Sequence, residues 1–300
     1  MIFDKHIVPE NYDEKIRLSE YLRDVFSSIP SRNGIYKAIK RGEISVNGNP
    51  AYTGDWVKPG MEIVYTPDRS EVKALFELKF DIVYEDEYLA IINKPPGIEV
   101  NGNKFKTIVN AIPGKINRSG EIDFLKIPQP VHRIDFGTSG LLMIAKTRQS
   151  QIILGNMFKD KTIQKTYHAL VIGSLQDKGK IDSTIGGKEA ISLFESMEII
   201  PSHNKGAITL VKLSPLTGRT HQLRIHLSSI GHPIVGDGNY GIKGMITKGK
   251  GMFLASTGMK FIHPVTNQHM DIHIDIPEKF IKYMNREKKR YIYHMENPNV

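Results

Sequence analysis

A single aspartate precedes a strongly apolar run near the middle of the chain. Asp135 follows His132 and Arg133, and the segment from Leu141 to Ala145 is entirely apolar. A polar, glycine-containing turn that leads into such a strand presents its side chains at the edge of a sheet. A carboxylate there can act as a nucleophile or an acid-base group, but it can equally cap the turn through its own backbone. Spacing alone leaves both interpretations of Asp135 open.

Other motifs that resemble catalytic or ligand sites lack the spacing that those sites require. The segment HRIDFG is similar to parts of the catalytic and magnesium-binding loops of protein kinases. In a kinase, however, these two loops are separate in the sequence and follow a glycine-rich strand and a Val-Ala-Ile-Lys strand. His221, His226 and His232 are five and six residues apart, whereas a helix brings together residues three or four apart. We therefore predict no metal site. The glycines from Gly236 to Gly241 indicate a tight loop rather than a phosphate cradle.

Length and charge narrow the class of protein. The 300 residues exceed the usual size of one domain, so we expect two. Forty-one Lys and Arg against 32 Asp and Glu give a net charge of +9, which favours a polyanionic partner such as nucleic acid or an acidic membrane surface. Cysteine is absent, and no run of 18 apolar residues occurs. We therefore expect a cytoplasmic protein that does not enter a membrane.

The first 66 residues predict a small unit of helices and a hairpin. Apolar spacing indicates a helix from Arg17 to Phe26 and a second helix after Ser31 that stops before Gly42. Asn47-Gly48 indicates a tight turn, and residues 56–65 indicate a further strand region that is broken by Pro59-Gly60. This segment is rich in positive charge, which is either a solvated helix face or a binding patch, carried by Arg32, Lys37, Lys40 and Arg41.

Strand patterns dominate the rest of the chain. Residues 67–80 are charged and weakly periodic, as in a linker, and the next domain is expected at 81–300. Two helices are predicted, at 149–158 and 221–230. We therefore expect an α+β domain around a mixed, largely antiparallel sheet. The predicted strands are 82–84, 89–93, 141–145, 167–172, 207–213 and 271–276.

Four segments in order resemble the motifs of one enzyme family. HRIDFGTSGLLMIAKT resembles the catalytic motif of RluA-type pseudouridine synthases, with Asp135 in place of their aspartate. VYEDEYLAIINKPPGI resembles the opening motif, KTYHALV the motif that carries the tyrosine, and LTGRTHQLRIHLSSIGHPIVGDGNYG the motif that carries the arginine. SRNGIYKAIKRGEISVNG resembles the alpha-L RNA-binding motif. The resemblance implies an alpha-L domain at 14–66 and a catalytic domain at 81–300.

The resemblance also implies a reaction and a set of residues. Converting uridine to pseudouridine breaks the bond from ribose to nitrogen and rejoins the base through carbon, so no cofactor is needed. Asp135, Tyr167 and Arg224 are the implied catalytic residues. Arg224 would keep the carboxylate ionised, while Arg219 is the competing choice or a phosphate ligand. Tyr167 would stack on the base and could assist proton removal, although a core tyrosine is the ordinary explanation.

The implied substrate is structured RNA from which the target nucleotide is extruded. Arg133 and His132 are assigned to RNA binding by the same resemblance, together with Arg219 and the basic residues of the first unit. We expect ribosomal rather than transfer RNA, and a monomer. Ile134 and Phe136-Gly137 depart from the family pattern, which puts target selection in doubt.

Two alternatives to this enzyme remain. A non-catalytic RNA-binding or ribosome-assembly factor could keep the fold, although it would need only charge and shape and not these three residues together. A glycosidase would need a second acid, and the matching motifs offer none. The basic stretch 279–290 is either a solvated tail or an added RNA contact.

Overall fold

Separate hydrophobic cores divide the chain into two units, residues 1–74 and 75–300. The computed structural model describes residues 4–26, 29, 31–66, 76–102, 104–245, 247 and 249–297. Most of the predicted linker, residues 67–75, lies outside these ranges. The two units are therefore treated one at a time, and the domain boundaries inferred from the sequence stay predictions.

Two helices pack on a small antiparallel sheet in the N-terminal unit. The helices are α1 (Leu18–Val25) and α2 (Arg32–Lys40). Ser31 caps α2, since its hydroxyl accepts the Gly34 N–H at 3.1 Å. The sheet has the order β1 (Asp4–Ile7), β4 (Glu62–Tyr65), β2 (Ile44–Val46), β3 (Asn49–Pro50).

The predicted hairpin turn is confirmed, and so is the break at Pro59-Gly60 in the strand region after it. Asn47 and Gly48 both have positive φ, 49° and 79°, as the turn between β2 and β3 requires. Within the region predicted for 56–65, Pro59-Gly60 forms a turn in which Gly60 has a φ of 71°, and the strand β4 begins after it at Glu62. Trp56 makes only an isolated bridge to Arg17.

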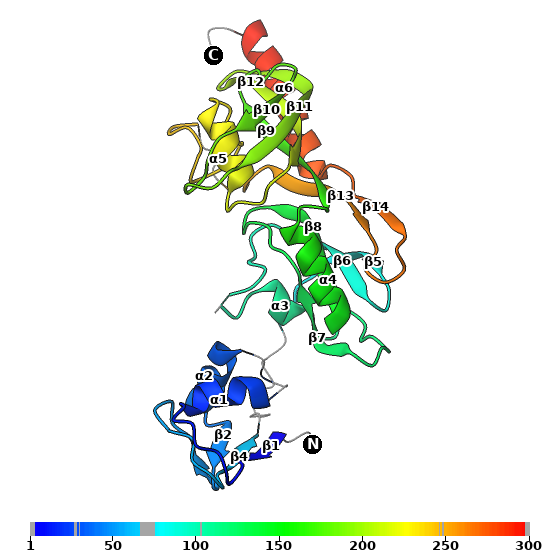
Figure 1. The fold of residues 1–300 in the computed structure, drawn as a ribbon. Helices are drawn as coiled ribbons and strands as arrows, with labels where there is room; N and C mark the ends of the chain where they lie inside the picture. The colour runs from blue at the N-terminus through cyan, green and yellow to red at the C-terminus, as the bar shows by residue number, and fades with distance from the viewer. Residues whose placement is uncertain are drawn as a thin grey trace. The chain divides into compact units, whose positions relative to one another are not determined.

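One mixed sheet forms the centre of the second unit, as predicted. Neighbouring strands run antiparallel except for β13 and β8, which are parallel. Figure 1 shows α4 (Arg148–Lys159) lying beside β8 in one half of this unit, while α5 (Gln222–Ser229) and α6 (Glu278–Glu296) lie in the other half. The sheet order is β10 (Lys178–Asp182), β11 (Ile191–Ser202), β12 (Gly206–Pro215), β9 (Gln164–Ile172), β13 (Leu254–Ile262), β8 (Ser139–Thr147), β6 (Leu89–Lys94), β5 (Asp81–Glu85).

Several elements of this unit carry no clear signal in the sequence. Strand β14 (His269–His273) pairs with β13 but ends before the predicted residue 276. Strand β7 (Phe124–Pro130), strands β10, β11 and β13 and the short helix α3 (Ile108–Ala111) were not predicted. The basic stretch 279–290 belongs to α6, which buries Phe280, Tyr283 and Met284 and is therefore not a solvated tail. No described helix is long and apolar enough to cross a membrane.

The two halves of the sheet meet where β8 approaches β13. Gly140 lies opposite Ser256 in this short parallel pairing and has a φ of 109°. A Cβ at this position would overlap the Ser256 carbonyl, and the backbone conformation is strained for any other residue. Glycine is therefore required at the join that holds Asp135, five residues earlier, against the rest of the sheet.

Substituting Gly140→Ala should destabilise the protein by at least about 3 kcal/mol, because backbone strain and overlap with the Ser256 carbonyl act together. Gly155→Ala is the matched control, since Gly155 lies within α4 and nothing surrounds the added methyl group. The control should be up to about 1 kcal/mol more stable than the wild type. Urea unfolding measures both, and equal stability of the two variants would contradict the close approach.

Candidate active site

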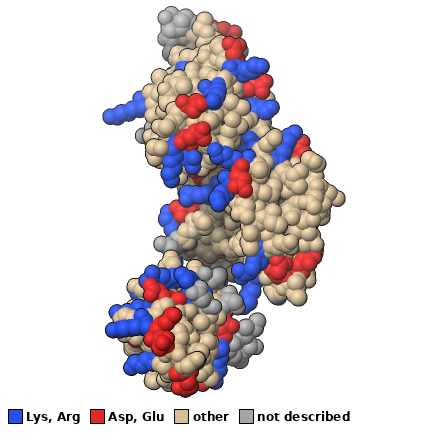
Figure 2. Space-filling model, in the orientation of Figure 1, with Lys and Arg blue, Asp and Glu red and all other residues tan. Residues whose placement is uncertain are grey.

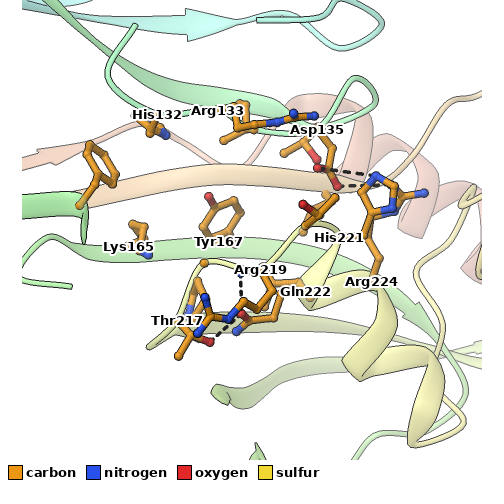
Figure 3. A pocket seen from close by; sticks show the side chains of 18 of the residues that line it. His132, Arg133, Asp135, Lys165, Tyr167, Thr217, Arg219, His221, Gln222 and Arg224 are labelled. Atoms are coloured by element: carbon orange, nitrogen blue, oxygen red, sulfur yellow. Dashed lines mark hydrogen bonds and ion pairs between the residues drawn. The ribbon is translucent and has the colours of Figure 1, made fainter. Parts of the chain in front are cut away.

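A cavity of about 320 Å³ opens beside the start of β9 and the start of α5. Such a volume suits a small ligand such as a nucleoside. Figure 2 shows Lys and Arg side chains around a hollow on the visible face of this unit. Figure 3 shows Asp135, Arg224 and His221 at one side of the cavity, with Lys165 at the other and Tyr167 between. The charged residues that line it are Asp135 and the cations Arg133, Lys161, Lys165, Arg219 and Arg224.

Hydrogen bonds from the segment that begins at Lys94-Pro95 support the loop that carries Asp135. The Thr138 N–H bonds the Asp135 carbonyl at 3.0 Å and closes the turn. The Phe136 carbonyl accepts the Gly97 N–H at 2.7 Å, and the fully buried Lys94 ammonium donates to the carbonyls of Pro95 and Ile98 at 3.0 Å. Burial lowers the pKa of Lys94 to about 8, against the opposing pull of the Asp135 charge. The opening motif thus fixes the backbone beneath the aspartate.

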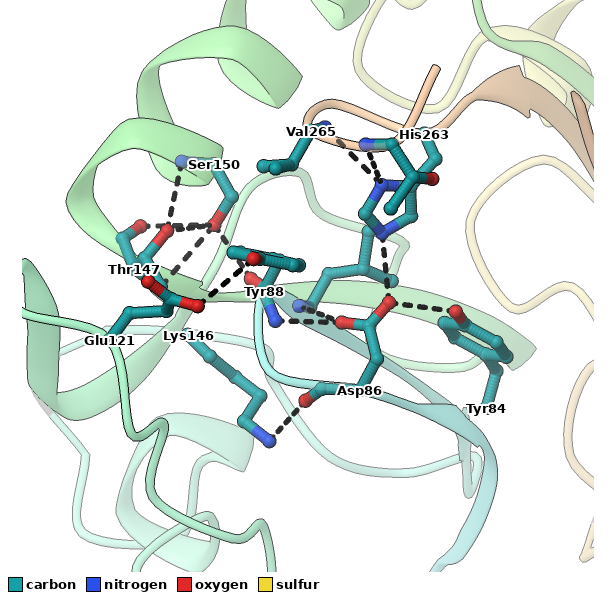
Figure 4. A network of polar contacts seen from close by, with 11 residues as sticks. Tyr84, Asp86, Tyr88, Glu121, Lys146, Thr147, Ser150, His263 and Val265 are labelled. Atoms are coloured by element: carbon teal, nitrogen blue, oxygen red, sulfur yellow. Dashed lines mark hydrogen bonds and ion pairs between the residues drawn. The ribbon is translucent and has the colours of Figure 1, made fainter. Parts of the chain in front are cut away.

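A polar network anchors the hairpin that leads into Lys94. Asp86, in the turn between β5 and β6, accepts the Tyr84 hydroxyl at 2.7 Å, the backbone N–H of Tyr88 and of Leu89, and His263 Nε2 at 2.8 Å (Figure 4). His263 Nδ1 in turn accepts the backbone N–H of Val265 at 3.2 Å. The network therefore ties this hairpin to the turn between β13 and β14.

Arg224 joins two carboxylates. Its Nη1 lies 3.2 Å from Asp135 Oδ2, while Nε and Nη2 bond both oxygens of Asp237 at 2.7 and 2.8 Å. Burial opposes ionisation of Asp237, but the bonds from Arg224 and from the N–H groups of Asn239 and Tyr240 outweigh it and lower the pKa of Asp237. Burial likewise opposes the charge of Arg224, and the two carboxylates outweigh it and raise the pKa of Arg224. Arg224 is therefore held as a cation against Asp135.

Sequence reasoning missed Asp237 and the position of His221. Asp237 was passed over inside a loop treated only for its glycines, although a lone acid between two glycines is a visible signal. His221 has a left-handed φ of 57° where α5 begins, so its ring turns into the cavity. Its Nε2 lies 4.0 Å from Asp135 Oδ1, and its Nδ1 bonds the Tyr240 hydroxyl at 3.0 Å. This backbone conformation has no sequence signature.

Tyr167 lies half-buried in the cavity wall on β9. Burial raises the pKa of its hydroxyl to about 12, and the negative charge of Asp135 adds to this effect. The hydroxyl therefore stays protonated at neutral pH. Its ring offers a flat apolar surface, and its O–H is a hydrogen-bond donor.

The other residues assigned to RNA binding have different surroundings. Arg133 is exposed at the cavity, whereas the His132 ring stacks on Phe158 with centroids 4.3 Å apart. His132 Nε2 accepts the Met143 N–H at 3.0 Å, and burial with the charge of Lys165 lowers the pKa of His132 to about 3. His132 therefore enters the cavity wall as a neutral ring.

Arg219 does not contact Asp135, so the geometry favours Arg224 over it as the ion-pair partner. Arg219 Nε donates to the Glu189 carbonyl at 2.9 Å. The loop that carries it is fixed by Gln222, whose Oε1 accepts the Arg219 N–H at 3.0 Å and the Thr217 hydroxyl at 2.6 Å. Arg219 is thereby left at the cavity rim.

The remaining predicted RNA-binding residues belong to the N-terminal unit. Arg32 pairs with Glu20 at 2.7 Å, and Arg41 pairs with Glu43 at 2.6 Å. The Lys40 ammonium lies 4.8 Å from the centre of the Tyr36 ring, and Lys37 is exposed in the last turn of α2. Among the described residues of the whole chain, no three His, Cys, Asp or Glu side chains gather as a metal site requires.

The free energy of unfolding should fall through the window from pH 6.5 to about 3 partly because of His132. Its pKa is lower in the folded chain than in the unfolded chain, so protons favour unfolding by up to about 1.4 kcal/mol per pH unit for one proton. His132→Gln keeps an acceptor for Met143 and should show a shallower loss of stability on acidification. Urea unfolding across this window tests the slope, with His269→Gln on the exposed start of β14 as control.

Comparisons with known proteins agree on one family. The family model described as RNA pseudouridylate synthase matches residues 88–229. Ribosomal large subunit pseudouridine synthase C of Vibrio vulnificus (strain CMCP6) is 32% identical over 303 residues, which cover 89% of this chain and 91% of that protein. The uncharacterized RNA pseudouridine synthase YlyB of Bacillus subtilis (strain 168) is 32% identical and covers 86% of this chain and 90% of its own length.

A solved structure gives the same answer for the fold. Human RNA Pseudouridylate Synthase Domain Containing 1 is 25% identical, with a TM-score of 0.55 over 66% of this chain and 84% of that chain. The fold, the ordered motifs and the relatives together identify the reaction as isomerisation of uridine in RNA. The chain belongs to the RluA-type RNA pseudouridine synthase family.

Proposed function

We propose that this enzyme modifies uridines of large-subunit ribosomal RNA, with Asp135, Tyr167 and Arg224 as its catalytic residues. The observation that carries the assignment is the carboxylate of Asp135, held by a buried guanidinium at the mouth of a cavity of nucleoside size. The names of relatives such as the Vibrio vulnificus enzyme support a ribosomal over a transfer RNA target. We also propose that the enzyme acts as a monomer in the cytoplasm.

Asp135 is suited to stabilise the ribose as its bond to the base breaks. Positive charge develops at C1′ when the bond to N1 lengthens, and an ionised carboxylate nearby stabilises it whether or not a covalent bond forms. Arg224 occupies Oδ2, whereas Oδ1 has no hydrogen bond to any described residue and faces His221 across 4.0 Å. The base then turns, C1′ bonds to C5, the C5 proton leaves, and N1 gains a proton, so atoms and charge balance.

Tyr167 supports the turning base by stacking and hydrogen bonding. A phenol with a pKa of about 12 is a poor acceptor for the C5 proton at neutral pH, because almost none of it is ionised. Its ring lies between the two ends of the cavity, where a flat base can pack against it (Figure 3). We therefore assign the proton transfer to a group other than Tyr167.

Asp135→Asn should abolish the modification while leaving the protein folded, since the amide keeps the shape of the side chain and loses its charge. The test maps pseudouridine in total RNA from a strain that lacks the gene, complemented with the wild type or the variant. We expect a site in large-subunit ribosomal RNA that disappears in the deletion strain and returns only with the wild type. A site restored equally by the variant would contradict the role of Asp135. If the wild type also fails on unmodified RNA, the chain is a non-catalytic RNA-binding factor.

We further propose that residues 14–66 form an alpha-L RNA-binding domain. The support is the confirmed order of two helices and a hairpin, together with the basic end of α2. Arg32 and Arg41 are partly neutralised by glutamates, so Lys37 and Lys40 supply the positive charge that faces solvent.

Replacing Lys37 and Lys40 together by Gln should weaken RNA binding about 10-fold or more. The slope of log affinity against log salt should fall by about 1 for each lysine that contacts a phosphate. Lys58→Gln is the matched control, since Lys58 is an exposed lysine of the same unit. Filter binding to ribosomal RNA at several salt concentrations measures both values. An unchanged slope in the double variant would exclude this unit as a phosphate contact.

A further inference from the structure

Lys165 is a cation in the cavity wall that has no partner among the described residues. It precedes Tyr167 by two residues on β9, so both side chains project from the same face of the strand into the cavity. No hydrogen bond or ion pair joins Lys165 to another residue in the described part of the chain. Figure 3 shows it at the end of the cavity opposite Asp135.

Stability does not explain a lysine at this position. Burial lowers the pKa of Lys165, and the positive charge of Lys161 lowers it further. Lys165 in turn lowers the pKa of His132, so its charge is unfavourable to two neighbours. A half-buried ammonium without a compensating partner costs free energy, whereas an apolar side chain of similar length would not. The charge is therefore retained for something that enters the cavity.

Two further cations lie at the same rim. Lys161 Nζ lies 3.5 Å from Glu189 Oε2, and Arg219 Nε bonds the backbone carbonyl of that same residue. Glu189 thus brings Lys161 and Arg219 together. The exposed Glu189 carboxylate offsets only part of the charge of Lys161 and Arg219. Asp135 does not offset the rest, because it is already bound to Arg224.

We propose that Lys165, with Lys161 and Arg219, binds a backbone phosphate next to the extruded uridine and so sets the depth to which the nucleotide enters. The proposal rests on the assigned activity on RNA. Uracil is neutral and needs no cluster of cations, whereas a phosphate carries a full negative charge and accepts bonds from ammonium and guanidinium groups. Figure 3 shows Tyr167 between Lys165 and Asp135, which leaves space for the base between a phosphate on Lys165 and the reacting carboxylate.

The first test compares Lys165→Met with the wild type and with Lys159→Gln. Lys159 is an exposed lysine at the end of α4 that does not line the cavity. On unmodified large-subunit ribosomal RNA, Lys165→Met should lower kcat/KM about 10- to 100-fold, chiefly through KM, and reduce the salt slope by about 1. Its Tm should equal or exceed that of the wild type, whereas a structural lysine would lower it on removal. Lys159→Gln should change none of these.

The second test identifies the phosphate. In a synthetic RNA that spans the modified uridine, each neighbouring phosphate in turn is replaced by a neutral methylphosphonate. One replacement should cost the wild type about 10-fold or more in kcat/KM and cost Lys165→Met less than about 3-fold, because the partner charge is already missing.

The outcomes separate this proposal from the assigned function. If the wild type forms pseudouridine and every replacement costs both proteins equally, Lys165 contacts the base or nothing, and only the phosphate site is overturned. A Tm of Lys165→Met well below that of the wild type would also overturn it, in favour of a structural role. If the wild type forms no pseudouridine in any RNA, the assigned function fails, and the phosphate site fails with it.

Discussion

The buried contact between Arg224 and its two carboxylates is the constraint on which the active site depends. Asp237 has no exposed side-chain surface, and both its oxygens are bonded to the guanidinium, so the arginine cannot rotate without stranding a buried charge. Breaking such a pair by removing one partner costs about 3 to 5 kcal/mol. The Nη1 group of Arg224 is left to face Asp135. The orientation of the Asp135 carboxylate is therefore set by packing inside the fold rather than by the substrate.

The same arrangement does not fit the two-carboxylate mechanism of glycoside hydrolases. Glycoside hydrolases use two carboxylates, one as acid and one as nucleophile or as the base that activates water. Here the second carboxylate, Asp237, is occupied by Arg224 and does not line the cavity. Asp135 is the only acid among the lining residues that the structure describes. No second carboxylate among these lining residues is available to activate water, as the hydrolytic mechanism requires.

The fold was predictable where local pattern decides it. The hairpin at Asn47-Gly48, the cap at Ser31 and the strands with continuous apolar runs follow from short-range chemistry. Strand β11 was missed because only scattered residues of it are buried, and its pairing with β12 is broken by a register shift at Ser196. The break at Pro59-Gly60 was also predictable, since both residues favour turns, and Trp56 before it forms only an isolated bridge.

The site was predictable in its residue types and less so in its contacts. Order of motifs singled out Asp135, Tyr167 and Arg224, and the fold brings all three to one cavity, which is a geometric agreement that leaves their roles to be tested. The contact of Asp237 with Arg224 depends on a loop that returns to α5, and the orientation of the His221 ring depends on its left-handed backbone. Both are features of the tertiary structure. Spacing along the chain carries no information about either.

Two lysine charges, one beneath Asp135 and one in the cavity wall, are held at a cost to the folded state, and this gives the substrate its role in completing the site. Burial disfavours the charged forms of Lys94 and Lys165, and His132 is kept neutral. Hydrogen bonds from Lys94 to backbone carbonyls beneath Asp135 offset part of this cost. Lys165 has no such acceptor among the described residues. An anion entering beside Tyr167 would relieve this imbalance, and it would do so only when the nucleotide is inserted. Binding energy from the RNA backbone can then offset the few kcal/mol needed to extrude the base.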